Sequence, residues 1–397
     1  MVNILGINIS TLNREEVFKK ITELMNGGQH YLVTPNPEIV LASHRDEEYF
    51  YILNQADLAP ADGFGLVIAG LLAGEKIPRI AGSDLTPQLL AEAEEKNWPV
   101  SILNWHGGLS SAADIQKILG EKWPKLKFQI IDLEKTIILP EEIIDSLNRF
   151  APKILFCAFG APFQEKVIYH NLSKIPSINL AAGIGGSFDF LTKKAIRAPR
   201  IFRKIGLEWL WRVIKQPKRI KRIWRATAVF LWKIFLWRFI NPHCYRSNVS
   251  CLMVRKNNNI WEALLVERTD PRGHWQIPQG GTDGESVEKA GLRELREETG
   301  VKNLAVHGIL KKAFKYRFIQ NDYRGITKGT PKHFDYCGQK QSFLIAEMLN
   351  PEEEIKINFW DHAAWRFVPL EKLVEEVHPV RREAMEKVLN FAKKVLK

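Results

Sequence analysis

Residues 280–301, with the sequence GGTDGESVEKAGLRELREETGV, decide how the C-terminal part of this chain folds. Apolar residues recur among charged ones after a glycine-rich turn, and this period predicts a helix. Glu294, Glu297 and Glu298 share one face of that helix, because residues three and four positions apart are neighbours. Adjacent carboxylates repel one another unless a cation lies between them, and Mg²⁺ takes oxygen ligands of this kind. A solvated acidic helix face is the alternative.

The order of residues in this segment resembles the Nudix box, G-x5-E-x7-R-E-U-x-E-E-x-G-U. Glu285 matches the first Glu of the box, and Arg293 follows it eight positions later as the box requires. The turn from Gly280 to Glu285 is one residue shorter than in the box. The resemblance covers about residues 247–397 and implies an α/β/α sandwich with a mixed sheet. It assigns structural roles to Gly280, Gly281, Glu285, Arg293 and Gly300.

The same resemblance implies hydrolysis of a phosphoanhydride with Mg²⁺ or Mn²⁺ as cofactor. The expected metal ligands are Glu294, Glu297, Glu298 and Asp361, of which Glu297 and Glu298 are also the expected catalytic residues. We expect Glu285 to pair with Arg293 rather than to bind metal. The flanking segments HWQIPQGG (274–281) and GQKQSF (338–343) are similar to hydrolases of RNA 5′-pyrophosphates and dinucleoside polyphosphates. A nucleoside polyphosphate or capped nucleotide is therefore the expected substrate.

Length and composition indicate an ordinary globular protein with more than one domain. A chain of 397 residues predicts two or three domains, and a hydrophobic content of 45% is enough for real cores. The four cysteines are widely scattered, which suggests reduced thiols in a cytosolic protein. We see no signal-peptide pattern at the N-terminus and no apolar run long enough for a membrane span.

The formal charge of +12 is concentrated between Arg197 and Arg238, where Glu208 is the one acidic residue. Five tryptophans are interleaved with the lysines and arginines of this segment. Such a composition suits an anionic membrane surface, because basic side chains meet lipid headgroups while indoles lie at the interface. A nucleic-acid patch, or a basic helix that packs its aromatic side chains into its own domain, are the alternatives.

Strands and helices alternate in the first 245 residues. Apolar, β-rich runs are found at 30–34, 100–104, 128–131, 154–158 and 178–181. Helical periodicity is found at 14–25, 87–96, 112–119, 140–150 and 163–171. This alternation predicts a Rossmann-like parallel sheet covered by helices on both faces. Ligands of such sheets bind beyond the carboxyl ends of the strands.

Several polar clusters follow these predicted strand ends. They are TPNPE (34–38), ADGFG (61–65), RIAGSDL (79–85), FGAPFQE (159–165), GIGGSFD (183–189), RAP (197–199) and LEWLWR (207–212). Taken in this order, they resemble the WecG/TagA/CpsF glycosyltransferase family over about residues 3–225. The resemblance implies transfer of a sugar, often N-acetylmannosamine, from a UDP donor to a polyprenyl-diphosphate-linked acceptor. It also implies that the reaction takes place at the cytoplasmic face of the membrane and needs no cofactor.

The family resemblance identifies Asp62 as the catalytic base, which takes a proton from the acceptor hydroxyl. The expected substrate-binding residues are Thr34, Asn36, Arg79, Gln164, Glu165, Gly185, Arg212, Arg219 and Arg222. A departing UDP needs positive charge or backbone N–H groups, which the arginines and the glycine run at 183–186 are expected to supply. The sequence NWHGG (104–108) and Ala161 depart from the family pattern.

The sequence thus predicts two fused enzymes. A glycosyltransferase domain spans residues 1–245, with a basic helical appendage at about 197–240, and a Nudix hydrolase domain spans 246–397. The expected location is the cytoplasm, peripheral at the inner face of the cell membrane, and a homo-oligomer is allowed. Two alternatives stay open at this point: a Nudix hydrolase tethered to the membrane by an inactive N-terminal half, and a binding protein that senses nucleotides.

Overall fold

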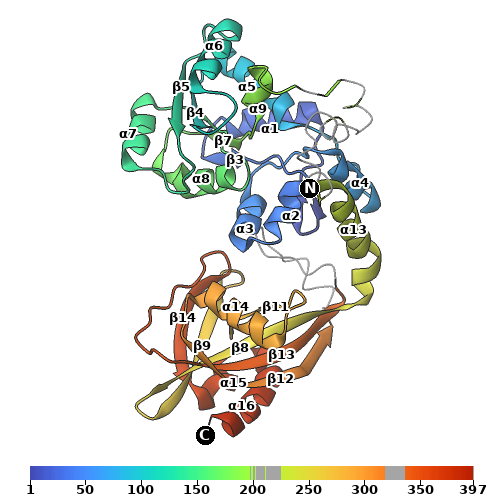
Figure 1. Cartoon of the computed structure of the whole chain (residues 1–397), viewed down its shortest axis with the longest axis vertical. Coiled ribbons are helices and arrows are strands. Elements are labelled where there is room, and N and C mark those ends of the chain that lie inside the picture. Colours follow the sequence, from blue (N-terminus) through green and yellow to red (C-terminus); the bar gives the residue numbers. More distant parts are fainter. Residues whose placement is uncertain (197, 200–201, 203–210, 212–224, 318–335, 397) are drawn as a thin grey trace. The chain divides into compact units, whose positions relative to one another are not determined.

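The computed structural model describes residues 1–196, 198–199, 202, 211, 225–317 and 336–396. The chain divides into two compact units, Met1–Arg238 and Phe239–Lys397 (Figure 1). Arg212, Arg219 and Arg222, which the sequence assigns to substrate binding, lie outside the described residues. Every helix in the described ranges is too short or too polar to cross a bilayer.

Five of the described strands form a parallel sheet in the first unit, in the order β3-β7-β6-β4-β5. They are β3 (His30–Leu32), β4 (Val100–Trp105), β5 (Phe128–Leu133), β6 (Ile154–Cys157) and β7 (Leu180–Gly183). The chain runs outward from β4 to β5 and then returns to β6 on the other side of β4. Open parallel sheets bind ligands beyond the carboxyl ends of their strands where the winding reverses in this way.

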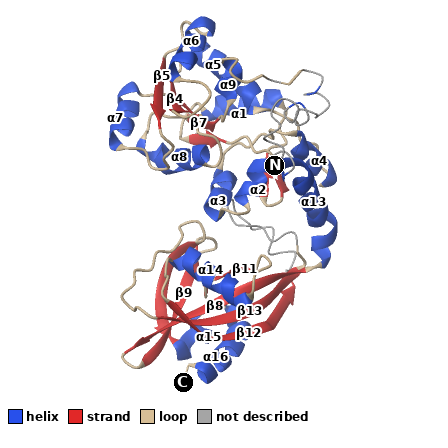
Figure 2. Ribbon diagram, viewed as in Figure 1, coloured by secondary structure: helices blue, strands red, loops and turns tan. Residues whose placement is uncertain are grey.

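Helices cover both faces of this sheet (Figures 1 and 2). One face carries α1 (Arg14–Leu24), α5 (Gly82–Glu95) and α6 (Ala112–Lys122), and the other carries α7 (Glu141–Phe150) and α8 (Phe163–Asn171). Successive strand residues point to opposite faces. Ile102 and Phe156 accordingly pack toward α1, α5 and α6, whereas Leu103 and Leu155 pack toward α7 and α8. The predicted parallel sheet with helices on both faces is confirmed.

The first unit contains further elements beside these layers. They are β1 (Val2–Ile4), β2 (Ile7–Ile9), α2 (Pro37–Ser43), α3 (Glu47–Gln55), α4 (Phe64–Leu72), α9 (Ser187–Leu191) and α13 (Phe230–Phe235). Helix α13 buries Phe230 and Ile234 against α2 and α4. Trp232 and Phe235 of the same helix are exposed and stack on one another, with ring centroids 5.6 Å apart.

The second unit is built on a mixed sheet to which seven described strands contribute. Its strands are β8 (Tyr245–Asn257), β9 (Ile260–Arg268), β10 (Trp275–Gln276), β11 (Gln279–Gly281), β12 (Leu304–Arg317), β13 (Gly338–Met348) and β14 (His362–Pro369). The main order is β10-β9-β8-β13-β12, while β11 pairs with β8 and β14 pairs with β9. The β8–β13 pair is parallel, whereas the other pairs are antiparallel.

Helices enclose this mixed sheet from both sides (Figure 2). Helix α14 (Val287–Thr299) packs Ala290 and Leu295 on one face. Helices α15 (Leu373–Glu376) and α16 (Arg382–Val395) cover the other face, where Val388 joins Leu252 and Phe343. The α/β/α sandwich that the sequence predicts for this half is confirmed.

Candidate active sites

A cavity of about 590 Å³ lies at the carboxyl ends of the parallel strands in the first unit. Segments that follow all five strands line it, which places it where the reversal of winding predicts a ligand. Its size suits a nucleotide-sized molecule. The lining includes Thr34, Asn36, Asp62, Arg79, Asn104, Trp105, Lys135, Gly160, Gln164, Gly185 and Asp189. Six of the residues that the sequence proposes for this site are therefore brought together at one cavity.

Backbone hydrogen bonds fix Asp62 at the cavity wall. The amide N–H of Asp62 donates to the carbonyl of Pro35 over 2.7 Å, and Ile80 N–H donates to the carbonyl of Ala61 over 2.8 Å. The next residue, Gly63, has a φ of 139°, a backbone conformation that residues other than glycine rarely adopt. The main chain at Asp62 is thus held between the segment that follows β3 and the segment that contains Arg79.

Thr34 and Asn36 flank Asp62 and are ordered by helix ends. The side-chain oxygen of Asn36 caps α2 by accepting a hydrogen bond from Ile39 N–H over 3.0 Å. Its NH₂ group, which the cap does not use, can donate to a ligand. Thr34 is buried against the first turn of α5, where a Cβ on Gly82 would lie 3.2 Å from Thr34 Oγ1.

Gln164 joins two glycine loops at the base of the cavity. Its Oε1 accepts hydrogen bonds from Gly160 N–H over 3.1 Å and from Gly185 N–H over 2.8 Å. Its Nε2 donates to Glu165 Oε1 over 2.6 Å. The N–H groups at 183–186 are expected to contact the diphosphate. Of these, the Gly185 N–H donates to Gln164 in this structure, although Gly185 itself lines the cavity.

Glu165, expected to bind substrate, is instead wholly buried and is not part of the cavity lining. Its Oε2 accepts a hydrogen bond from the hydroxyl of Tyr49 on α3 over 3.2 Å. Burial raises the pKa of Glu165 from 4.5 to about 7, against the lowering effect of its hydrogen bonds. The two neighbours in the QE motif point to different places, because α8 begins at Phe163 and turns Glu165 toward the core.

Lys135 and Trp105 belong to the cavity and were missed from the sequence. Lys135 Nζ lies 3.8 Å from the centre of the Trp105 ring, which is a cation–π distance. Trp105 is the last residue of β4, and Lys135 lies two residues after the end of β5. The rule that ligands bind at carboxyl ends of strands was the signal that could have found them.

In the second unit, Arg293 organises the acidic face of α14. Its guanidinium donates to Glu285 Oε2 over 2.9 Å, to Glu294 Oε1 over 2.8 Å and to Glu297 Oε2 over 2.9 Å. It also donates to the carbonyl of Gly281 over 2.9 Å. The hydrogen bonds from Arg293, followed by those from Lys289, lower the pKa of Glu285. Glu285 therefore fixes the turn to the helix.

Glu294 and Glu298 lie one turn apart on α14, and both are buried, whereas Glu297 is exposed. A Cβ on Gly280 would overlap the Glu294 carboxylate, so only glycine allows this approach of β11 to the helix. Glu298 Oε2 accepts a hydrogen bond from Gln279 N–H over 3.2 Å. Gly300 ends the helix in the left-handed conformation, with a φ of 74°.

Asp361, the further candidate ligand, lies beside Arg268 rather than within this carboxylate pair. Its burial raises its pKa, and the Arg268 charge opposes the rise. Strand β14 pairs with β9 in a register that sets His362 opposite Arg268. As a result, His362 rather than Asp361 reaches Glu298, with Nε2 3.8 Å from Glu298 Oε2. Within the described ranges, no three His, Cys, Asp or Glu side chains are grouped closely enough to hold a metal ion.

The residues present nevertheless suit a hard divalent cation. Two buried carboxylates face the Gln279–Gly280 backbone, and oxygen donors of this kind are what Mg²⁺ and Mn²⁺ prefer. Burying two carboxylates on neighbouring turns is costly, and a cation between them would add to the compensation that Arg293 gives Glu294. Glu294 and Glu298 are therefore the residues that fit such an ion best.

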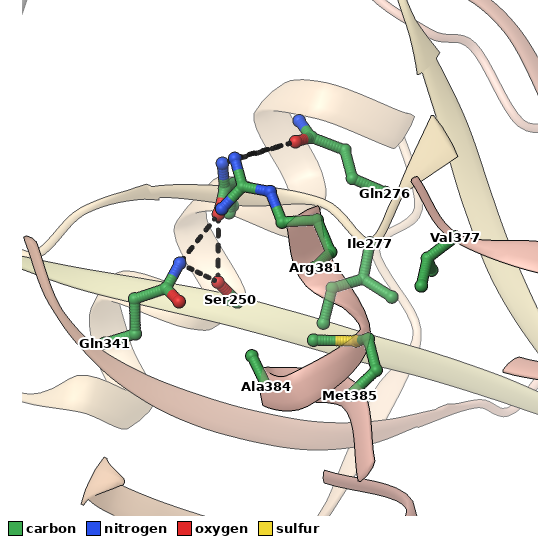
Figure 3. Close-up of a pocket in the computed structure, with 9 residues that line it drawn as sticks. Ser250, Gln276, Ile277, Gln341, Val377, Arg381, Ala384 and Met385 are labelled. Atoms are coloured by element: carbon green, nitrogen blue, oxygen red, sulfur yellow. Dashed lines mark hydrogen bonds between the residues drawn. The ribbon is translucent and has the colours of Figure 1, made fainter. Parts of the chain in front are cut away.

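A small polar pocket lies on the other face of the same sheet, toward α16 (Figure 3). Gln341 Nε2 donates to Ser250 Oγ over 3.3 Å and to Gln279 Oε1 over 3.1 Å. Arg381 Nη2 donates to Gln276 Oε1 over 3.2 Å. The space of about 10 Å³ between these side chains is room for about one water molecule. This pocket is too small for a nucleotide.

Two family models match the chain. Residues 2–243 match the model described as Glycosyl transferase WecG/TagA/CpsF family, and residues 245–388 match the NUDIX domain model. A relative from Staphylococcus aureus (strain MRSA252) is described as N-acetylglucosaminyldiphosphoundecaprenol N-acetyl-beta-D-mannosaminyltransferase. It is 31% identical over 241 residues, which cover 59% of this chain and 91% of that protein.

Solved structures resemble the second half at low identity. The Ap4A hydrolase of C. elegans, in a binary complex, is 20% identical with a TM-score of 0.28 and covers 38% of this chain and 98% of its own. The dihydroneopterin triphosphate pyrophosphohydrolase of E. coli is 16% identical with a TM-score of 0.29 and covers 38% and 99%. Likeness at this level carries no functional argument. From the family matches, the chain belongs to the WecG/TagA/CpsF family of glycosyltransferases, and a region that matches the NUDIX domain model follows it in the sequence.

Proposed function

We propose that residues 1–245 transfer an N-acetylhexosamine, of the N-acetylmannosamine type, from a UDP-sugar to a polyprenyl-diphosphate-linked acceptor. The observation that carries this proposal is the cavity at the carboxyl ends of the strands, where Asp62, Thr34 and Gln164 meet. The printed name of the Staphylococcus aureus relative supports both the sugar and the acceptor. No cofactor is needed for this half.

In this proposal each group has a distinct task. Asp62 takes the proton from the acceptor hydroxyl as the new glycosidic bond forms, and UDP leaves with the bonding electrons. Arg79 and Lys135 at the cavity wall stabilise the negative charge that develops on the departing diphosphate. We propose that Arg212, Arg219 and Arg222 contribute further positive charge when the donor binds.

The test is sugar transfer by the full-length chain from labelled UDP-N-acetylmannosamine to a polyprenyl-diphosphate-linked N-acetylglucosamine acceptor. Asp62→Asn should abolish transfer while UDP binding survives, because the base acts on the acceptor and not on the donor. Asp145→Asn is the matched control, since Asp145 is exposed on α7 outside the cavity lining. Transfer at the wild-type rate by Asp62→Asn would show that Asp62 is not the base.

We propose that residues 246–397 hydrolyse a nucleoside diphosphate-linked compound, of the nucleoside polyphosphate or capped-nucleotide class. The observation that carries this proposal is the pair of buried carboxylates, Glu294 and Glu298, against the backbone of Gln279 and Gly280. A bound Mg²⁺ or Mn²⁺ supplies charge neutralisation for the phosphates and an oriented water. Arg293 holds Glu294 and Glu297 in register for this work.

Hydrolysis is tested with a panel of nucleoside polyphosphates, in the presence and absence of Mg²⁺ or Mn²⁺. Glu298→Gln should lower turnover by orders of magnitude, because a neutral amide cannot offset the charge of a metal. Glu288→Gln is the control, since Glu288 is exposed on the same helix. Equal turnover in wild type and Glu298→Gln would remove Glu298 from the site.

We propose that the chain is cytoplasmic and attaches peripherally to the inner face of the cell membrane. The described part of the basic segment supports this, because Trp232 and Phe235 of α13 are 60% and 43% exposed. Leu71 and Leu72, at the end of α4, are exposed as well, and Arg238 Nε donates to the Leu72 carbonyl over 3.0 Å. Tryptophan and phenylalanine side chains at an interface add apolar burial to the electrostatic attraction.

A further inference from the structure

A continuous chain of hydrogen bonds runs behind the wall of the transferase cavity. It begins at the Tyr49 hydroxyl, passes through the Glu165 carboxylate and reaches the Gln164 amide. The Gln164 Oε1 then binds two main-chain N–H groups, those of Gly160 after β6 and Gly185 after β7. Both glycines have positive φ values, 74° and 50°, so both loops depend on a conformation that glycine favours. One amide oxygen therefore connects two loops that line the cavity.

We propose that Glu165 is a positioning residue for sugar transfer, which fixes the Gln164 side chain in the orientation that ties these two loops together. The proposal rests on the transferase function proposed above. Glu165 does not line the cavity, so it acts through Gln164 rather than on the substrate.

The reason lies in the two faces of an amide. A glutamine side chain turned by 180° exchanges its oxygen for its NH₂ group, and only neighbouring partners decide between the two orientations. In the orientation seen here, Oε1 faces two N–H donors and Nε2 faces a carboxylate, so every pairing joins a donor to an acceptor. In the reverse orientation, NH₂ would face two N–H groups and the oxygen would face a carboxylate. The two N–H donors and the Glu165 carboxylate therefore favour the same orientation, in which Glu165 supplies the acceptor for Nε2.

Packing leaves the amide little room to adjust in another way. Gln164 is buried, and a Cβ on Gly183 would lie 2.7 Å from Gln164 Nε2. The second carboxylate oxygen of Glu165 is held by Tyr49 on α3, which also joins α8 to the rest of the core. Without an acceptor at position 165, Gln164 Nε2 loses its hydrogen-bond partner. Nothing on that side then holds Gln164 Oε1 toward the N–H groups of Gly160 and Gly185.

The test compares variants of the full-length chain by hydrogen–deuterium exchange, with peptides that contain Gly160 and Gly185. In Glu165→Leu, exchange at both glycines should be about tenfold faster, the effect expected when one hydrogen bond is lost. The dissociation constant for UDP should rise by a similar factor. Exchange in β4 should stay unchanged, which separates loss of position from loss of fold.

Conservative variants make the role specific. Glu165→Gln keeps a carbonyl oxygen that accepts from Gln164 Nε2, so it should restore wild-type exchange at both glycines and wild-type UDP binding. Tyr49→Phe removes the other hydrogen bond to Glu165 and should leave Gly160 and Gly185 unchanged. If Glu165→Leu does not fold, Glu165→Met, with a more adaptable side chain, takes its place.

The outcomes separate this inference from the proposed function. Wild-type exchange at both glycines in Glu165→Leu, or exchange in Glu165→Gln as fast as in Glu165→Leu, would overturn the positioning role. Faster exchange at Gly160 and Gly185 in Glu165→Leu, when the wild-type protein itself does not bind UDP, would support the positioning role. The same result would reject UDP-sugar as the donor. Normal UDP binding together with unchanged exchange would reject the positioning role alone.

Discussion

Replacing Gly280 by Ala should slow Nudix hydrolysis strongly while leaving the fold in place. The new Cβ would overlap the carboxylate of Glu294, well inside the ~3.5 Å at which carbon atoms make contact. The obstructed atoms are the end of a flexible side chain, so the carboxylate can move by the ~1.5 Å that contact requires while the helix stays where it is. A displacement of about 1 Å at a reacting centre costs on the order of 100-fold in rate. We therefore expect kcat/KM to fall by at least about 100-fold.

The assay is turnover of the nucleoside polyphosphate panel by the full-length chain with Mg²⁺ or Mn²⁺, together with a thermal melt. Gly120→Ala is the control, because a Cβ there meets nothing within 4 Å and the residue lies on α6 of the first unit. That change should keep hydrolysis and stabilise its helix by up to ~1 kcal/mol. A Gly280→Ala protein that melts like wild type and hydrolyses at the wild-type rate would refute the reasoning, since Glu294 would then not need its place at Gly280.

Two further predictions concern pH and the membrane. Burial raises the pKa of Glu165 to about 7 against 4.5 in the unfolded chain, so the folded protein holds the proton more tightly. The stability of the first unit should therefore fall as pH rises from about 4.5 to about 7, by up to ~3 kcal/mol, and Glu165→Gln should remove this fall. Urea unfolding of both proteins at each pH measures it, and parallel pH profiles would contradict it. Each basic residue near an anionic surface contributes about 1 kcal/mol, so vesicle binding should weaken with salt. Vesicle binding should also be lost when four basic residues outside the described ranges are neutralised together, while Nudix hydrolysis stays unaffected. Equal binding to neutral and anionic vesicles would contradict the electrostatic attachment. The four residues are Lys218, Arg219, Lys221 and Arg222.

Local sequence patterns were enough for most of the secondary structure around both sites. Helix α8 runs from Phe163 to Asn171, the range that its periodicity predicts, and β4 begins at Val100 as expected. Helix α5 begins at Gly82 although the sequence predicts a start at residue 87. Proline at position 87 favours a helix start by its fixed φ, but the first turn is stabilised by packing on Thr34, which lies far away in the sequence.

The positions of residues that depend on pairing between distant segments could not be predicted from local sequence patterns. The choice of His362 over Asp361 at Glu298 follows from the register between β14 and β9, and a shift of one residue would exchange the two faces. Lys135 reaches the transferase cavity because β5 lies at the edge of the sheet beside β4. Strand order and register are properties of the folded chain, and a single sequence does not display them.

The QE pair shows that a motif gives no information on which of its residues faces the cavity. Gln164 and Glu165 are adjacent, so any resemblance assigns them together to one site. On a helix, neighbours in sequence point about 100° apart, and α8 sends Gln164 to the cavity wall and Glu165 into the core. A buried carboxylate destabilises a fold unless its hydrogen bonds compensate, and here they come from Tyr49 and Gln164. Burying the Glu165 charge costs free energy of folding. Under the proposed positioning role, the fixed orientation of the Gln164 amide is what the protein gains from that cost.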